Sequence, residues 1–248
     1  MAQRPRIACF HGGGSNEVIF KTQCRQLQKE LDSVLELVFF NAPFTSQPGP
    51  DILPAFATSA PFRSWFKIEA ETGELADGSG YDDLGNDGLE RVRKMMRAVG
   101  PAEEWVGVMG FSQGTRVVGG LLLDQQRRAQ ARARGEICEP CDIQIRFGVL
   151  CVGGGAPMLP TLNGIKAQLP YSNDKAHSEE DRIAVPTLHY LGLRDINLPR
   201  GKIILQKYYD ASSAKLWELD YHHAMPWVKS ENLEFACLIK NMYNITRS

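Results

Sequence analysis

The sequence lacks a surplus of charge of either sign, and this argues against a polyanionic partner such as a nucleic acid. Its 28 Lys and Arg residues nearly balance 29 Asp and Glu residues, which leaves a formal net charge of −1 over 248 residues. A nucleic-acid-binding protein is expected to carry a clustered basic face. The one basic run, residues 127–134, is interleaved with Ala and Gln and is typical of a solvated helix end. We therefore predict no nucleic-acid partner.

Long apolar runs are also absent. No stretch is long enough to span a bilayer. Residues 1–6 are polar and lead straight into a predicted strand, unlike a signal peptide. We expect no membrane association and a reduced, cytoplasmic location.

Metal-binding and nucleotide-binding patterns are missing as well. Four of the six cysteines stand alone in apolar or helical stretches, where Cys behaves as a small hydrophobe. Cys138 and Cys141 have C-x-x-C spacing, but no second pair or His pair completes a metal site. Neither G-x-G-x-x-G nor G-x-x-x-x-G-K-[ST] occurs. The sequence predicts no metal and no organic cofactor.

What the sequence does contain is an alternation of short apolar runs and amphipathic stretches. The runs are β-branched or aromatic and end at Gly, Pro or Asn, which predicts strands at 7–10, 35–40, 105–109, 143–152, 187–193 and 215–219. Apolar stripes predict helices at 17–31, 83–99, 115–123, 199–209 and 233–243. Such alternation predicts an α/β fold, with a mainly parallel sheet and helices on both faces. We expect one domain over residues 1–248.

Two long segments, 42–80 and 153–185, break this alternation. Long irregular segments of compact domains are often functional loops or lids. The first is rich in aromatic side chains, and the second opens on three glycines. We predict that both line or cap a substrate pocket, with Phe62, Trp65 and Phe66 as candidate lining residues. For any single one of these side chains, ordinary packing is the alternative.

The strongest local signal is the sequence Gly-Phe-Ser-Gln-Gly at 110–114. It follows a predicted strand and precedes an apolar helix, which is the context of a nucleophile elbow. The flanking glycines are expected because a side chain would collide in so tight a turn. Ser112 is therefore the predicted nucleophile.

A nucleophilic serine needs a general base and an acid that orients the base, and in this type of fold they follow in the order Ser, Asp or Glu, His. Asp195 follows the predicted strand 187–193, so its carboxylate is expected at the same rim of the sheet as the serine. The rivals are weaker, since Asp210 is expected to end a helix and Asp220 lies only three residues before His223.

Two adjacent histidines, His222 and His223, follow the last predicted strand, where a base can reach over the sheet. Position alone does not separate them. His189 falls inside a strand and is expected in the core, and His177 is expected in a solvated loop. After the first strand comes His-Gly-Gly-Gly at 11–14, and such a loop can offer backbone N–H groups to an oxyanion. We predict the N–H groups of Gly13 and Gln113 as the donors.

These motifs together resemble the FSH-type family of serine hydrolases over nearly the whole chain. The matching elements are Phe10-His11-Gly12 with Asn16, Arg63-Ser64-Trp65-Phe66, the elbow at 110–114, Gly192-x-x-Asp195 and His223-x-x-Pro226. The last match favours His223 over His222 as the base. Tyr221 and His222 stand where the family usually has two glycines.

The resemblance is closest to FSH-type thioesterases that release acyl chains in fungal polyketide pathways. It implies an acyl thioester or ester substrate and a carrier-protein domain of a polyketide synthase as a partner. Because carrier proteins of related systems are acidic, a basic contact patch is expected, with candidates Arg63, Lys67, Arg194 and Arg200. Two alternatives remain: a carboxylesterase acting on small free esters, and a catalytically silent binding protein on the same fold.

Overall fold

The computed structural model describes residues 4–67, 87–137, 141–159, 161–162, 165–166 and 182–247. A six-stranded sheet forms its centre, and every pair of neighbouring strands is parallel. In spatial order the strands are β10 (Ala214–Leu219), β9 (Thr187–Gly192), β6 (Phe147–Cys151), β5 (Trp105–Phe111), β1 (Arg6–Phe10) and β2 (Glu36–Phe40). Every residue of β5, β6 and β9 is buried, as expected for central strands covered on both faces.

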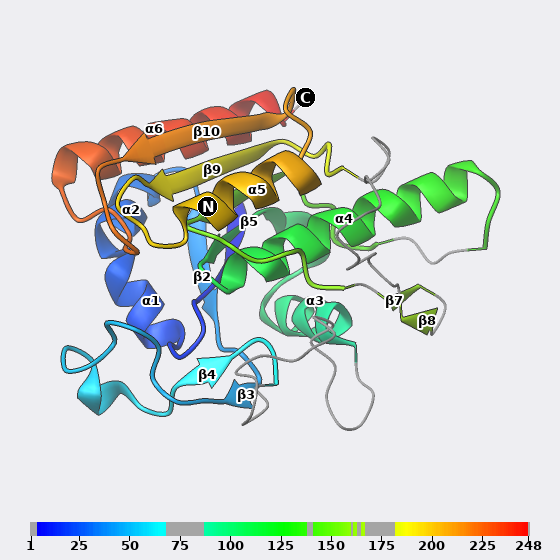
Figure 1. Cartoon of the computed structure of the whole chain (residues 1–248). Helices are drawn as coiled ribbons and strands as arrows, with labels where there is room; N and C mark the ends of the chain where they lie inside the picture. The colour runs from blue at the N-terminus through cyan, green and yellow to red at the C-terminus, as the bar shows by residue number, and fades with distance from the viewer. Residues whose placement is uncertain are drawn as a thin grey trace.

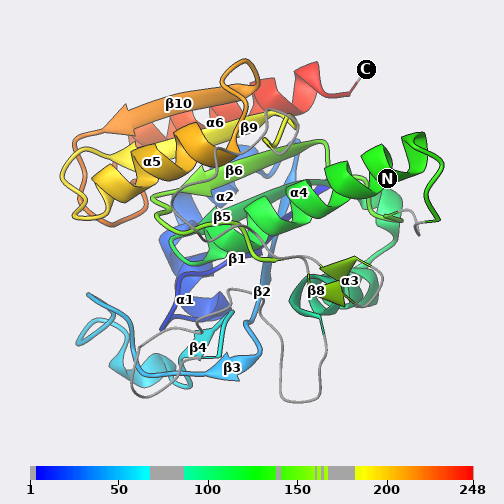
Figure 2. The ribbon, with the colours of Figure 1, turned by 45° about the vertical axis from the view of Figure 1, so that its right-hand side comes forward.

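Helices cover both faces of the sheet (Figures 1 and 2). On one face α1 (Glu17–Gln23), α2 (Arg25–Leu31) and α6 (Lys229–Ile245) enclose one apolar cluster. On the other face α3 (Gly88–Val99), α4 (Gly114–Ala133) and α5 (Leu198–Tyr208) enclose a second. The predicted α/β fold with a parallel sheet is confirmed. No helix among the described residues has the length and apolar character to cross a membrane.

The order of the strands determines where a ligand is expected. From β1 the chain runs to β2 on one side and then crosses to β5 on the other side. Ligands of open α/β sheets bind at such a reversal, outside the carboxyl ends of the strands. The loop at 11–14 follows β1, and Ser112 follows β5. Both candidate motifs therefore leave the sheet at the same crevice.

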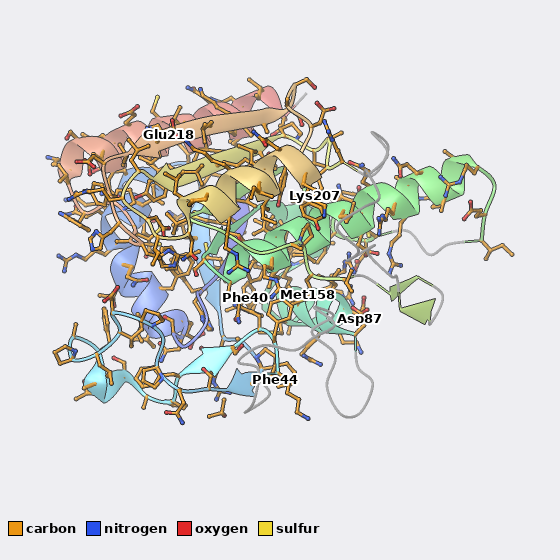
Figure 3. All side chains as sticks on the ribbon, viewed as in Figure 1. Phe40, Phe44, Asp87, Met158, Lys207 and Glu218 are labelled. Atoms are coloured by element: carbon orange, nitrogen blue, oxygen red, sulfur yellow. The ribbon has the colours of Figure 1, made fainter. Side chains whose placement is uncertain are left out.

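Several predicted boundaries are wrong in detail. The predicted helix 17–31 is two helices that meet at Cys24. The predicted helix 115–123 continues to Ala133 and carries the basic run at its outer end. Helix α3 begins at Gly88, directly after Asp87 (Figure 3). The Asp87 side chain accepts a hydrogen bond from the Glu90 N–H. The predicted start at residue 83 lies outside the described residues.

The predicted strand 143–152 is shorter, because β6 begins only at Phe147. Residues 143–146 alternate apolar and polar side chains as a strand does, and Ile143 and Ile145 are buried. However, the side-chain amide of Gln125 on α4 bonds both the N–H and the carbonyl of Ile145, at 2.8 and 3.0 Å. A side chain thus satisfies the backbone groups that a neighbouring strand would otherwise bond.

The two irregular segments contain short pieces of strand. In 42–80, β3 (Phe44–Thr45) pairs antiparallel with β4 (Arg63–Ser64), and a 3-10 turn covers Ala57–Ser59. In 153–185, β7 (Thr161–Leu162) pairs with β8 (Ile165–Lys166). Residues 68–80 of the first segment and most of 160–181 of the second lie outside the described residues.

Candidate active site

Ser112 occupies a sharp turn between β5 and α4. Its φ is 51°, in the left-handed region that few residues other than glycine adopt. Its N–H donates to the carbonyl of Cys151 at the end of β6, at 2.9 Å. Backbone strain of this kind persists where the surrounding structure enforces it, and it clusters at functional sites. The conformation is that expected of a nucleophile elbow.

Steric crowding explains the two glycines that flank the elbow, Gly110 and Gly114, as the sequence predicts. A Cβ on Gly110 would lie 2.4 Å from the backbone carbon of Gly114. A Cβ on Gly114 would lie 2.1 Å from the carbonyl oxygen of Phe10 in β1. Helix α4 therefore starts in direct backbone contact with β1, and only glycine permits this approach.

Gly114→Ala is expected to destabilise the protein by about 3 kcal/mol or more, at the upper end of overpacking costs, because the colliding atoms are backbone. The measurement is chemical denaturation of both proteins. Gly154→Ala is the matched control, since the nearest atoms to its new Cβ lie at 3.5 Å, an ordinary contact. Equal stability of the two variants would contradict the steric argument.

The candidate acid and base meet across two neighbouring loops. Asp195 follows β9, His223 follows β10, and the His223 Nδ1–H donates to Asp195 Oδ2 at 2.7 Å. The other carboxylate oxygen accepts the N–H of Asn197 at 2.8 Å. The Asp195 side chain is only 3% exposed, whereas that of His223 is 24% exposed. The carboxylate is thus fixed from two sides, and the imidazole still reaches the surface of the crevice.

The rival residues lie elsewhere. His222 is exposed and packs edge-on against Trp227, at 5.6 Å between ring centroids. Asp220 is exposed and forms an ion pair with Arg194 at 2.9 Å. Asp210 accepts hydrogen bonds from the backbone and hydroxyl of Ser212 in a turn after α5.

The remaining histidines are not near the pair or are not described. His189 lies in the core, as predicted, where burial lowers its pKa from 6.5 to about 3. His177 lies outside the described residues.

Tyr221 stands where the family usually has a glycine, two residues before the candidate base, and its side chain has a structural role here. Its ring packs against Trp227 at 4.3 Å between centroids, and its hydroxyl donates to Glu231 of α6. The Tyr221 side chain therefore ties the loop that carries His223 to α6. A tyrosine at this position serves as an anchor rather than a flexible joint.

The loop at 11–14 lies directly against the elbow. A Cβ on Gly12 would be 3.3 Å from the Cβ of Ser112, and a Cβ on Gly13 would be 3.0 Å from the Gln113 side-chain nitrogen. Among the described residues, no acceptor takes a hydrogen bond from the N–H of Gly13 or of Gln113. Both predicted donors thus lie beside Ser112 with their N–H groups available.

His11 holds this loop in place, a role that sequence reasoning missed. Its Nδ1 donates to the carbonyl of Gly12 at 2.7 Å, and its Nε2 accepts the N–H of Ala42 at 3.0 Å. Burial lowers the pKa of His11 from 6.5 to about 4. The ring is therefore neutral at physiological pH and uses both nitrogens to join β1 to the segment after β2.

The segment around β4 supports the elbow from outside. The Gln113 side-chain oxygen accepts the N–H of Trp65 at 2.9 Å and the hydroxyl of Ser64 at 3.2 Å. The indole N–H of Trp65 donates to the carbonyl of His11 at 2.8 Å. These bonds fix the side chain of Gln113, so that its backbone N–H keeps a constant direction.

Trp65 and Phe66 are not at the pocket where the sequence placed them. Each is only 1% exposed, inside the core under α3 and α4. Phe62 is half-buried, and it too is absent from the lining of the described pocket. Trp65 and Phe66 instead support residues at the site, Trp65 through its hydrogen bond to His11 and Phe66 through its contact with Arg116.

A cavity of about 200 Å³ opens at Ser112. Its described lining is Ser112, Gln113, Arg116, Val152, Gly154, Gly155, Asn197, Arg200 and His223. Val152 has a φ of 47°, which is rare for a β-branched residue, so a second strained position faces the cavity. The candidate nucleophile and the candidate base thus share one cavity.

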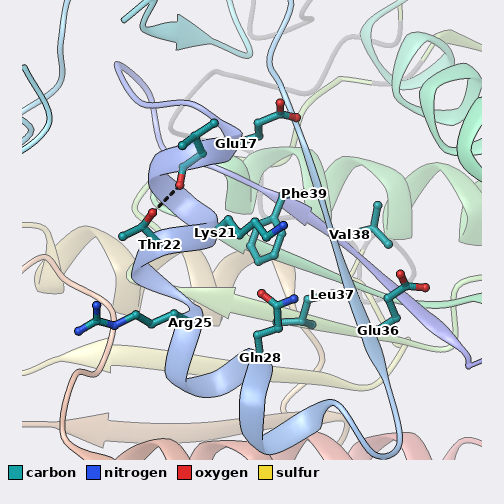
Figure 4. A pocket seen from close by; sticks show the side chains of 10 residues that line it. Glu17, Lys21, Thr22, Arg25, Gln28, Glu36, Leu37, Val38 and Phe39 are labelled. Carbon is teal, nitrogen blue, oxygen red and sulfur yellow. Dashed lines mark hydrogen bonds between the residues drawn. The ribbon is translucent and has the colours of Figure 1, made fainter. Parts of the chain in front are cut away.

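A larger hollow, of about 780 Å³, lies between α1, α2 and the edge strand β2 (Figure 4). Its lining includes Lys21, Arg25 and Glu36, but neither Ser112 nor the His–Asp pair. Size alone would favour this hollow, but the chemistry favours the smaller cavity. No group of three or more His, Cys, Asp or Glu residues in the described part of the chain is arranged to hold a metal ion. Cys138 lies outside the described residues.

Residues 1–235 match the protein family described as "Serine hydrolase (FSH1)". The chain belongs to this family. As a family member it is a serine hydrolase of the esterase type, and the resemblance predicted from its motifs is confirmed.

Curated relatives of this FSH1-family hydrolase include two fungal esterases. It is 34% identical over 230 residues to "Esterase citA" of Monascus ruber, which covers 90% of this chain and 85% of the relative. It is 33% identical over 234 residues to "Esterase claE" of Penicillium crustosum, with 90% of this chain and 86% of the relative covered.

Solved structures share the fold of this hydrolase at low sequence identity. Acyl-protein thioesterase 2 of Zea mays has a TM-score of 0.57 and 16% identity, over 98% of this chain and 95% of that one. The Bacillus cereus carboxylesterase has a TM-score of 0.52 and 12% identity, over 96% and 89%. Identities this low establish the α/β-hydrolase fold alone.

Proposed function

We propose that this hydrolase cleaves an acyl thioester or ester through a covalent acyl intermediate on Ser112. His223 Nε2 takes the Ser112 hydroxyl proton as the oxygen attacks the acyl carbonyl, and then gives that proton to the leaving thiol or alcohol. Water, deprotonated by the same imidazole, attacks the acyl-enzyme and releases the acid. Asp195 holds the Nδ1–H tautomer throughout. The N–H groups of Gly13 and Gln113 stabilise the oxyanion of both tetrahedral intermediates.

The observation that carries this mechanism is the 2.7 Å hydrogen bond from His223 Nδ1 to Asp195, beside a serine at a φ of 51°. With Nδ1 bound to the carboxylate, Nε2 is the nitrogen that remains for Ser112, and both residues line one cavity. An intact His–Asp pair also argues against a catalytically silent binding protein. We further propose a single domain, since strands from Arg6 to Leu219 join one sheet.

For the natural substrate we propose an acyl chain carried on the phosphopantetheine arm of a polyketide synthase. The resemblance to FSH-type thioesterases and the similarity to Monascus and Penicillium esterases support this choice. Of the candidate basic contacts, Arg200 lines the cavity, whereas Arg194 is paired with Asp220. A carrier domain at the cavity mouth would therefore meet Arg200 first.

A second candidate function is hydrolysis of small free esters. The size of the cavity, about 200 Å³ among the described residues, favours a short acyl group. The two candidates differ in the leaving group and in the length of the acyl chain. They share every step that Ser112 and His223 perform.

Acyl release from a loaded carrier protein is expected to exceed hydrolysis of the same acyl group as a simple ester by at least tenfold in kcat/KM. A thioester is the more electrophilic carbonyl, and the carrier adds contacts that a free ester lacks. Single-turnover release is measured for both substrates, with Ser112→Ala as the background. Turnover of short free esters with no release from any loaded carrier would instead support the carboxylesterase.

A further inference from the structure

Two arginines line the same cavity as the candidate nucleophile. Arg116 lies one helical turn after Ser112 on α4, and Arg200 lies in the first turn of α5. The nine described lining residues include no Asp or Glu. The cavity thus presents two arginine side chains beside the candidate nucleophile. Neither arginine has a part in the acyl-transfer steps described above.

Arg116 is held in a fixed position. Its guanidinium carbon lies 3.9 Å from the centroid of the Phe66 ring, and its Nε donates to the carbonyl of Ala156 at 3.0 Å. A Cβ on Gly155 would be 2.6 Å from the Arg116 Cδ, so this glycine makes room for the side chain. The residue is only 7% exposed. A planar guanidinium fixed in this way is organised in advance to bind a carboxylate with little loss of entropy.

Arg200 approaches the same space from the next helix. A Cβ on Gly154 would lie 3.5 Å from the Cβ atoms of both Arg200 and Asn197, so this glycine also keeps the cavity open. Asn197 is the residue before the first turn of α5, and a helix N-terminus favours negative charge. No described acidic side chain lies within ion-pair distance of Arg200. Two cations and a helix N-terminus therefore meet at one wall.

We propose that the cavity binds substrates that carry a carboxylate within a few bonds of the scissile carbonyl, and that Arg116 and Arg200 hold this carboxylate. The proposal rests on Ser112 being the nucleophile. A phosphate on a carrier arm is separated from the thioester by the length of the arm, so it does not reach a site one helical turn from Ser112. The carboxylate belongs either to the acyl group or to the leaving group.

Paired esters separate these two sources. On the acyl side, the 4-nitrophenyl monoester of glutaric acid is compared with its neutral isostere, the 4-nitrophenyl ester of glutaramic acid. On the leaving-group side, 4-acetoxybenzoate is compared with 4-acetoxybenzamide. Rates with Ser112→Ala are subtracted, because the glutarate monoester also hydrolyses by attack of its own carboxylate. The quantity measured is the ratio of kcat/KM for the anionic ester to that for its neutral isostere.

For the wild type we expect a ratio of at least ten in one of the two pairs, and that pair identifies the part of the substrate that carries the carboxylate. Arg200→Gln is expected to lower this ratio at least fivefold. Arg116→Lys keeps the charge but loses the planar guanidinium with its paired N–H donors, and it is expected to lower the ratio by a similar factor. Lys202→Gln is the matched control on α5, since Lys202 pairs with Glu218 instead of facing the cavity, and its ratio should equal that of the wild type.

A ratio of one or less in both pairs, with normal turnover of the neutral esters, would overturn the anion site and leave the hydrolase mechanism standing. A high ratio that neither arginine variant changes would overturn it as well. Arg200→Gln gives this test even if Arg116→Lys does not fold, because Arg200 is exposed. Absence of turnover with all four esters would instead count against the proposed function.

Discussion

Ser112→Ala is expected to abolish esterase activity and covalent labelling by a fluorophosphonate probe. The hydroxyl forms the only covalent bond to the acyl group in the proposed mechanism, and no other described lining residue of the cavity carries a hydroxyl or thiol. In a well-studied serine protease the equivalent loss is on the order of 10⁶-fold in kcat. The measurements are steady-state turnover of an activated ester and mass spectrometry of the labelled protein.

The matched control is Ser230→Ala, which removes an exposed hydroxyl in the first turn of α6. This variant is expected to keep wild-type activity and labelling. Undiminished labelling of Ser112→Ala would show that another residue is the nucleophile. Binding of substrate by Ser112→Ala should survive, because the cavity walls are unchanged.

His223→Ala is expected to lower kcat by a factor similar to that of the serine variant, since the base moves the proton in both halves of the reaction. His222→Ala is the natural control, because the two histidines are adjacent and only His223 bonds Asp195. His222 is exposed, and its removal costs a ring contact with Trp227. Equal, mild losses in both variants would contradict the assignment of the base.

For the acid, too, we expect a large loss at the assigned residue and a mild loss at its rival. Asp195→Asn is expected to lower kcat about 10⁴-fold, because an amide favours the wrong imidazole tautomer. Asp220→Asn should stay within about tenfold of the wild type, since an exposed ion pair such as Asp220–Arg194 contributes little. Comparable losses in the two variants would move the acid to Asp220.

The parts of the site that could be predicted are those determined by chain order and local geometry. Apolar runs that end at Gly, Pro or Asn located all six strands of the sheet. The signal is clearest for β5, β6 and β9, because a strand buried on both faces is apolar nearly throughout. Parallel strands bring their carboxyl ends to one rim. This made it possible to place Ser112, Asp195 and the loop at 11–14 together from strand order alone.

The parts that could not be predicted depend on contacts between distant segments. Strands β3 and β4 have two residues each, too few to show a period of two. Nothing in the residues around Cys24, neither Pro nor Gly, marks the bend between α1 and α2. The aromatic residues of 42–80 indicated a packed segment, but aromatic content does not distinguish a pocket wall from the core beneath it.

The hydrogen bonds of His11 are a further feature that the sequence could not predict, because they join distant segments. In the sequence, His11 stands beside three glycines and reads as part of a loop that binds an oxyanion. Its actual partners, Ala42 and Trp65, lie 31 and 54 residues away. A buried polar group finds its partners through tertiary packing, so its role is visible only once the fold is known.

Two buried histidines, His11 and His189, make the stability of the protein sensitive to acid. Burial lowers the pKa of His11 to about 4 and that of His189 to about 3, whereas both take up a proton near pH 6.5 once the chain unfolds. The unfolded chain thus binds more protons than the folded one throughout this interval. Both residues contribute full stability above pH 6.5, and their contribution is lost as the pH falls toward 4 and 3. Part of any acid limb in a pH–rate profile therefore records loss of the folded state rather than titration of the general base.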